Sequence, residues 1–418
     1  MKRKISIILS VALIFLAAFP FDLDAKKVKT IAFVGATLID GTGASPAKNT
    51  VVVIEGNKIK TVGPKGKVQI PEKAKVIDVS GKFILPGFID LHVHLTYPTR
   101  MEMMLSDTES LQTIRALSFM SKYLRAGVTS VRDVASDLEP MKAISAAAQY
   151  GLLDTIRVFS VGEGIVSTGG HGEMLSATQA ADGPEEWRKA VRKMKQAGFN
   201  YIKILPPYTP EEVRAAVEEA ITQNMLITSH CGSDLDFEPP YFSRIAVENG
   251  IQCIEHMNKI EDEVLEIMAE KGVHLVPTVG IVKHFRKLYQ GRKLPERMVP
   301  INVYEASFKK AKELGILMGI GTDFVFTLTG MYPKPFFIEM DHFVELGYTP
   351  METLVCATKN GAIILGKENE LGSIEAGKLA DLQVIDGDPL ESFDVLSKPE
   401  FVVIGGRLHH YPPNLIEQ

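Results

Sequence analysis

Cysteine is scarce in this sequence. Only Cys231, Cys253 and Cys356 occur among 418 residues, and no two of them have Cys-x-x-Cys spacing. An odd number of cysteines scattered through apolar segments does not indicate a disulfide framework. We therefore expect all three side chains to pack in the core.

An excess of positive charge is also missing. Lysine and arginine number 46 against 51 aspartates and glutamates, which gives a formal net charge of −5. Proteins that bind nucleic acid usually present a basic face to the phosphates, so nucleic acid is not an expected partner. The composition is otherwise that of an ordinary globular protein, with 45% hydrophobic and 23% charged residues.

The N-terminus carries a conspicuous apolar run. The basic start "MKRK" precedes the apolar "ISIILSVALIFLAAF", and a short polar stretch ends at the small Ala25. This order is typical of a secretory signal peptide, and the run is short for a membrane-spanning helix. We expect residues 1–25 to be removed, leaving an exported protein, periplasmic or secreted, that is not bound to the membrane. An uncleaved N-terminal anchor is the alternative.

Both ends of the remaining chain are rich in short β-type runs separated by turn residues. This pattern predicts one small β-sandwich domain built from residues 26–82 and 367–418. Between them, apolar strands alternate with amphipathic segments, which predicts an α/β fold: a (β/α)₈ TIM-type barrel over residues 83–366. Two helix starts carry a capping box with proline at the first position, Thr209 with Glu212 and Thr349 with Glu352. The eight expected strands lie at 87–95, 128–134, 156–164, 201–207, 225–231, 252–258, 274–280 and 316–324.

Polar side chains collect at the ends of these expected strands, where such barrels place their active groups. The first strand has two histidines at alternate positions, which point to the same side of a strand. Four imidazoles and a carboxylate suit Zn²⁺, although Mn²⁺, Fe²⁺, Co²⁺ or Ni²⁺ would also bind. Five ligands exceed the needs of one open tetrahedral site, so two divalent metal ions are expected. The five residues are His92, His94, His230, His256 and Asp323.

Lys203 offers the anionic bridge that two metal ions need. It stands between isoleucines in "YIKIL", where burial would lower its pKa toward the neutral amine. A neutral amine can react with CO₂ to form a carbamate, whose two oxygens can bridge two cations. The alternative is a lysine whose stem packs while its ammonium group reaches water.

The ordered motifs "GFIDLHVHL", "YIKIL", "SHC", "IEHM", "GTDF" and "GSIEAGKLADLQVID" resemble the amidohydrolase superfamily. The similarity is greatest to the imidazolonepropionase-related branch that includes Xaa-Pro and Xaa-Lys/Arg metallodipeptidases. The resemblance implies that His92, His94 and Asp323 bind the more buried metal and that His230 and His256 bind the more exposed one. It also implies that carbamylated Lys203 bridges the two.

The resemblance further implies a mechanism. A hydroxide that bridges the metals would attack the substrate carbonyl, and Asp323 would carry the proton to the leaving nitrogen. His171, in the glycine-rich "STGGHGEM", resembles a loop histidine that holds the substrate or its transition state; a solvated loop histidine is the alternative. Many relatives have a substrate-binding tyrosine three residues after the histidine that corresponds to His230, but this sequence has Ser233 there. Tyr241 or Arg244 is a candidate to replace it.

The expected function is therefore the hydrolysis of a C–N amide bond in a small substrate, a dipeptide (Xaa-Pro or related) or an N-acyl amino acid. The same chemistry would serve a cyclic amide, a lactone or a phosphotriester. A catalytically silent, metal-stabilised binding protein is the alternative from another class. Self-association into a homo-oligomer is a further expectation. The basic run at 283–297 is expected to be solvated, or to present a cation to an acidic substrate.

Overall fold

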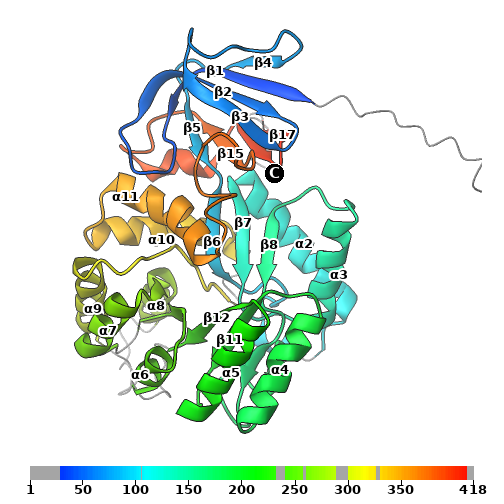
Figure 1. Ribbon diagram of the computed structural model, residues 1–418, viewed down its shortest axis with the longest axis vertical. Helices are drawn as coiled ribbons and strands as arrows, with labels where there is room; N and C mark the ends of the chain where they lie inside the picture. The colour runs from blue at the N-terminus through cyan, green and yellow to red at the C-terminus, as the bar shows by residue number, and fades with distance from the viewer. Residues whose placement is uncertain are drawn as a thin grey trace, which may run out of the picture.

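The computed structural model describes residues 29–104, 106–231, 241–257, 260–288, 300–325 and 330–411. The expected signal peptide, Ser233 and most of the basic run lie outside the described residues. Figure 1 shows a β-sheet at one end of the molecule and a larger body of parallel strands and helices at the other. Among the described residues, no helix has the length and apolar character needed to cross a membrane.

The sheet at one end combines strands from both ends of the chain. Eight strands form it, in the order β17-β16-β15-β5-β1-β2-β3 with β4 beside β1. Alternating side chains of β1 pack on its two faces, because successive residues of a strand point to opposite sides. The two-layer sandwich stays a prediction. The strands are β1 (Thr30–Leu38), β2 (Ala47–Glu55), β3 (Lys58–Pro64), β4 (Lys75–Asp78), β5 (Phe83–Pro86), β15 (Leu382–Ile385), β16 (Phe401–Ile404) and β17 (Arg407–His410).

Seven of the eight strands expected in the larger body are present, in two parallel sheets. One sheet has the order β6-β7-β8 and the other the order β10-β9-β11-β12-β13-β14. β6, β7 and β11 are wholly buried, as parallel strands covered by helices are. The strands are β6 (Phe88–Val93), β7 (Val128–Asp133), β8 (Arg157–Ser160), β9 (Gly164–Val166), β10 (Thr178–Ala180), β11 (Tyr201–Leu205), β12 (Leu226–His230), β13 (Cys253–Glu255) and β14 (His274–Val276).

The eighth expected strand, 316–324, is not a regular strand in the described structure. Met318 makes a single parallel bridge to Leu275 of β14. Leu91 of β6 donates its N–H to the carbonyl of Ile320 at 2.9 Å, so the segment lies between β14 and β6. A Cβ at Gly319 would lie 2.2 Å from Leu91 Cδ1, which shows how closely this backbone approaches β6. The segment thus connects the two parallel sheets, although the assigned strands do not form one closed sheet.

Helices follow most of the parallel strands and cover their outer side (Figure 1). Both predicted capping boxes are confirmed: Thr209 and Thr349 each accept the N–H of the glutamate three residues later, which bonds back to the threonine N–H. The helices are α2 (Glu109–Arg125), α3 (Leu138–Gln149), α4 (Pro184–Gln196), α5 (Pro210–Thr222), α6 (Tyr241–Glu248), α7 (Asp262–Lys271), α8 (Val279–Leu288), α9 (Ile301–Glu313), α10 (Lys334–Glu345), α11 (Pro350–Val355) and α12 (Gly361–Ile364).

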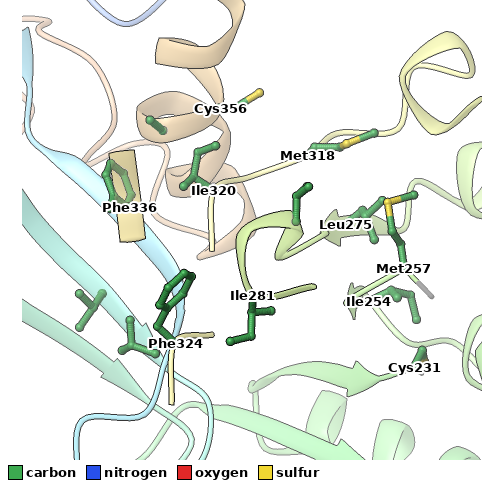
Figure 2. Packing of buried hydrophobic residues seen from close by; sticks show 14 of the residues in the cluster. Cys231, Ile254, Met257, Leu275, Ile281, Met318, Ile320, Phe324, Phe336 and Cys356 are labelled. Atoms are coloured by element: carbon green, nitrogen blue, oxygen red, sulfur yellow. The ribbon is translucent and has the colours of Figure 1, made fainter. Parts of the chain in front are cut away.

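The largest apolar core lies between the parallel strands and their helices. Figure 2 shows part of it, where side chains from β13, β14 and the 316–324 segment approach those of α8 and α10. Cys231 and Cys356 belong to this cluster and Cys253 to a smaller one, and all three thiols are free and buried. The predicted core role of the cysteines is confirmed.

Candidate metal centre

A cavity of about 140 Å³ brings together all six predicted metal ligands. His92 lies in β6, Lys203 in β11 and His230 at the end of β12, while His94 follows β6 and His256 follows β13. Asp323 follows the segment between β14 and β6. Because neighbouring parallel strands end at the same edge, residues far apart in the sequence meet here. The six are His92, His94, Lys203, His230, His256 and Asp323.

Asp323 lies at the centre of the histidines. Its Oδ1 is 3.4 Å from His92 Nε2 and 3.3 Å from His94 Nε2, and its Oδ2 is 3.8 Å from His256 Nδ1. His92, His256 and Asp323 each have one potential ligand atom within 4.8 Å of those of the other two. Burial alone would raise the pKa of Asp323, but the histidines hold that pKa well below its usual range.

The remaining histidine rings are also close to one another. The centroid of the His256 ring is 4.8 Å from that of His92 and 4.4 Å from that of His230, which in turn is 4.1 Å from that of His171. Burial, followed by the nearby His230, lowers the pKa of His256 well below its usual value. Neutral imidazoles are the form that binds a metal ion.

The backbone is in the left-handed region at two of the ligands. His256 has φ 66° and Asp323 has φ 49°, and Thr278, which contacts His256, has φ 55°. Residues other than glycine rarely adopt this conformation, which costs free energy. Two such residues at the cavity, and a third in contact with one of them, indicate that side-chain placement there is favoured over backbone relaxation.

Lys203 is buried and its amine has no hydrogen-bond partner among the described residues. The side chain is 2% exposed, so its amine does not reach the outer surface of the molecule. Burial lowers its pKa, although Glu255 and Asp323 act in the opposite direction. An unpaired buried cation is costly, so this position favours the neutral amine or a modified lysine.

The Nδ1 atoms of three histidines are held by hydrogen bonds. His92 Nδ1 lies 2.8 Å from Glu255 Oε2, His94 Nδ1 lies 2.7 Å from the carbonyl oxygen of Ala135, and His256 Nδ1 lies 2.7 Å from Thr278 Oγ1. Such bonds leave the Nε2 atoms for a metal, the arrangement common to histidine ligands. The sequence reasoning missed these partners. Only Glu255 had a signal, as the acidic residue in "IEHM".

His171 lies on the wall of the same cavity, and its contact with a substrate stays a prediction. Its N–H donates to the carbonyl of Pro206 at 2.8 Å, which ties its loop to the end of β11. Tyr97, which the sequence reasoning missed, also lines the cavity and stacks on His94 with ring centroids 4.4 Å apart. The other walls are largely apolar, with Val134, Leu175, Leu205 and Val325.

The two other candidate substrate residues are not among those that line the cavity. Tyr241 is 52% exposed at the start of α6 and packs on Phe242. The guanidinium group of Arg244 lies 3.0 Å from Glu261 and 2.6 Å from Glu263. These two carboxylates already pair with the guanidinium group of Arg244, which was predicted to bind a substrate carboxylate. Within the described part of the basic run, Lys283 is paired with Glu345 at 2.7 Å.

A divalent metal site fits the residues present. The cavity offers imidazole nitrogens whose orientation is already fixed, an ionised carboxylate and a buried amine without a partner. Nitrogen and oxygen donors of this kind suit Zn²⁺ and other divalent transition metals. Which histidines share a metal stays a prediction, because His256 is near both His92 and His230.

Known proteins resemble this chain in sequence and in fold. An ochratoxinase of Aspergillus niger is 27% identical, and the match covers 93% of this chain and 88% of that protein. An imidazolonepropionase of Geobacillus sp. (strain WCH70) is 24% identical over 81% of this chain and 84% of that protein. The crystal structure of a prolidase complexed with N-methylphosphonate-L-proline is 28% identical, with a TM-score of 0.80 over 92% of this chain and 100% of that one.

These matches confirm the predicted resemblance to the imidazolonepropionase-related proteins and to prolidase-like amidohydrolases. They also indicate an α/β fold that contains a TIM barrel. The model of the family described as "Amidohydrolase family" matches residues 83–409, which is most of the chain. The chain therefore belongs to the amidohydrolase family.

Proposed function

We propose that this protein is a two-metal hydrolase that cleaves the amide bond of a dipeptide or an N-acyl amino acid. One observation carries the proposal: the described cavity combines Asp323 and four histidines with a buried lysine amine that has no partner. A single metal ion would leave Lys203 without a role. A carbamate on Lys203 gives it one.

The carbamate forms from the neutral amine. The lone pair of Lys203 Nζ attacks the carbon of CO₂, an N–C bond forms, and one proton leaves the nitrogen. The product is a carbamate anion with two oxygens. Burial disfavours the charged form of the Lys203 amine, whereas two nearby cations would stabilise the negative charge of the carbamate. Lys203 would then bridge the metals, with His92, His94 and Asp323 on one side and His230 and His256 on the other.

Two bound Zn²⁺ ions would supply a water of lowered pKa and would polarise the scissile carbonyl. Asp323 would accept the proton of that water and deliver it to the leaving nitrogen, because its carboxylate is ionised and faces the cavity. His171, which also lines the cavity, would donate a hydrogen bond to the substrate.

The names of the relatives support this substrate class. A prolidase cleaves beside proline, and the matched structure holds an N-methylphosphonate derivative of L-proline. We infer that this chain acts on a similar small amide with a free carboxylate. Cyclic amides, lactones and phosphotriesters are the alternative substrates for the same site.

We also propose that residues 83–366 form a closed eight-stranded barrel, with the 316–324 segment as its eighth strand. Export of the protein after removal of residues 1–25 is a further proposal, as is assembly into a homo-oligomer. Cleavage after Ala25 would be seen as an N-terminus at Lys26 in protein recovered from the native host.

Metal reconstitution tests the lysine bridge. Metal-free protein is given Zn²⁺ with and without bicarbonate, and bound zinc is measured after desalting. We expect the parent protein to bind two equivalents of zinc, and to bind them faster with bicarbonate. Lys203→Ala should lose at least one of the two equivalents. In Lys203→Glu, which supplies a fixed carboxylate, zinc binding should not depend on bicarbonate. One equivalent that survives Lys203→Ala would reject the two-metal site.

A substrate panel tests the reaction. Xaa-Pro, Xaa-Lys and Xaa-Arg dipeptides and N-acyl amino acids are assayed for released amine, beside lactones and phosphotriesters. We expect the amides to be hydrolysed with the highest kcat/KM. Preference for a lactone or a phosphotriester would replace the proposed substrate class, and a fully metallated protein inactive on every panel would favour the binding protein.

A further inference from the structure

Glu255 connects four strands beneath the metal centre. It is the last residue of β13, is 0% exposed and is not among the residues that line the cavity beside the neighbouring His256. Its Oε2 is 2.8 Å from His92 Nδ1 in β6. Its Oε1 accepts hydrogen bonds from Thr228 in β12 and from the guanidinium group of Arg132 in β7.

Arg132 holds this carboxylate in place and is itself anchored beside His92. The arginine is 3% exposed, and its Nε donates to the carbonyl oxygen of Leu91 at 2.7 Å. Leu91 is the residue before His92, so one guanidinium group fixes both the carboxylate and the backbone next to the metal ligand. A planar guanidinium group is suited to such simultaneous contacts.

His92 thus differs from the other two histidines whose outer contacts are described. His94 faces a carbonyl oxygen and His256 a hydroxyl, both uncharged, whereas His92 faces a carboxylate. A carboxylate partner fixes the imidazole in the tautomer with Nε2 unprotonated and makes that nitrogen a stronger donor to a metal.

We propose that Glu255, held by Arg132, is a positioning residue that makes the metal position at His92 the tighter of the two. This inference rests on the proposed two-metal function and extends it, because it orders the two metal affinities. Removal of zinc by a chelator then proceeds in two steps. The first equivalent leaves from the position held by His230 and His256, and the second leaves from the position held by His92.

The effect of Glu255 on zinc affinity can be separated from its effect on folding by removing both charges of the Glu255–Arg132 pair. Glu255→Gln alone would leave the buried Arg132 without its counter-ion, which destabilises a protein whatever the role of the pair. The double variant Arg132→Met and Glu255→Gln removes both charges together. Its thermal unfolding temperature should recover toward that of the parent, while His92 still lacks a carboxylate partner.

The experiment measures zinc affinity by competition with a chromophoric chelator, together with thermal unfolding of the metal-free proteins. We expect the tighter equivalent to weaken on the order of 10- to 100-fold in the double variant despite restored stability. Thr278→Val, which removes the neutral partner of His256, is the matched control, and it should weaken mainly the looser equivalent.

Parent-like affinity of the tighter equivalent in the folded double variant would overturn the proposal. Glu255→Asp provides a second test should the double variant not fold, because it keeps the charge beside Arg132 but shortens the reach to His92. Weaker zinc binding in Glu255→Asp supports the role, and unchanged binding contradicts it. A parent protein with only one zinc site would instead refute the two-metal function itself.

Discussion

At the scale of single residues, the site relies on side chains whose protonation is set by burial and by close neighbours. Three histidines hold the pKa of Asp323 well below its usual range, while burial lowers the pKa of Lys203 toward the neutral amine. Ordinary pKa values would leave Asp323 ionised but would also leave Lys203 protonated. Burial of Lys203 is therefore the condition on which the proposed carbamate depends.

Asp323→Asn should retain metal and lose turnover. Asparagine keeps an oxygen near His92 and His94 but cannot accept a proton at neutral pH. We expect kcat to fall by about 10²- to 10⁴-fold, with bound zinc measured in the same sample to show that the site is filled. Near-parent kcat in the metallated variant would remove the proton-shuttle role.

Glu339 in α10 should make stability depend on pH. Burial raises its pKa to about 8, although the N–H groups of Val279 and Gly280 that donate to it act against this. Its unfolded value is near 4.5, so its stabilising protonation is complete below pH 4.5 and is lost as the pH rises through 8. The thermal unfolding temperature should therefore fall between pH 5 and 8.

The matched comparison for Glu339 uses a second glutamate of α10. Glu339→Gln should flatten the decrease in unfolding temperature between pH 5 and 8. Glu345→Gln should not, because Lys283 lowers the pKa of Glu345 and places its titration below this window. Equal slopes in the parent and in Glu339→Gln would show that Glu339 is not protonated in the folded protein.

At the scale of elements, the two capping boxes are similar in sequence and different in surroundings. Glu212 also accepts the N–H of Gly183 at 2.8 Å, at the start of α4, so it joins two helices. Glu352 is close to the exposed Lys312, at 3.4 Å, a contact of small effect. The same motif thus has a tertiary contact at one place and a surface contact at the other.

Substitutions at these caps should show that difference. Thr209→Ala and Thr349→Ala should each lower the free energy of unfolding by about 1 kcal/mol, the usual effect of losing a threonine cap. Glu212→Ala should cost more than Glu352→Ala, because it also leaves the Gly183 N–H without its acceptor. Chemical denaturation of the four variants measures this, and equal losses for the two glutamates would contradict it.

At the scale of the whole molecule, an ion pair joins the terminal sheet to the parallel strands. Arg157 of β8 donates from Nε and Nη2 to the two carboxylate oxygens of Asp381, at 2.8 and 3.1 Å. Asp381 lies just before β15 and its side chain is 4% exposed. The contact joins positions that are 224 residues apart in the chain.

Arg157→Met should therefore destabilise the protein by about 1–3 kcal/mol, since it leaves a buried carboxylate without its cation. Arg157→Lys should fall between Arg157→Met and the parent, because an ammonium group keeps the charge but not the two-pronged contact. The double variant Arg157→Met and Asp381→Asn should regain part of the loss. Thermal unfolding measures all three, and no recovery in the double variant would argue against a charge effect.

The sequence correctly predicted seven of the strands around the site. It was wrong in predicting that the eighth, 316–324, is a regular strand. Seven expected strands are present because apolar runs bounded by turn residues are strong local signals. The 316–324 segment has the same apolar pattern, but Gly319 and Gly321 bring its backbone against β6 and β14. That close packing is a property of neighbouring elements, and a local pattern does not contain it.

By itself the sequence determined which residue types stand at the ends of consecutive strands, and this was enough to predict the family and the ligand set. Only the tertiary structure decided which side chains meet outside that set. His92 and Glu255 are 163 positions apart and touch because β6, β12 and β13 end together, while Arg244, near in sequence to His230, is paired with surface carboxylates. Contacts of this kind depend on the order of strands and the direction of each side chain, which local patterns do not specify.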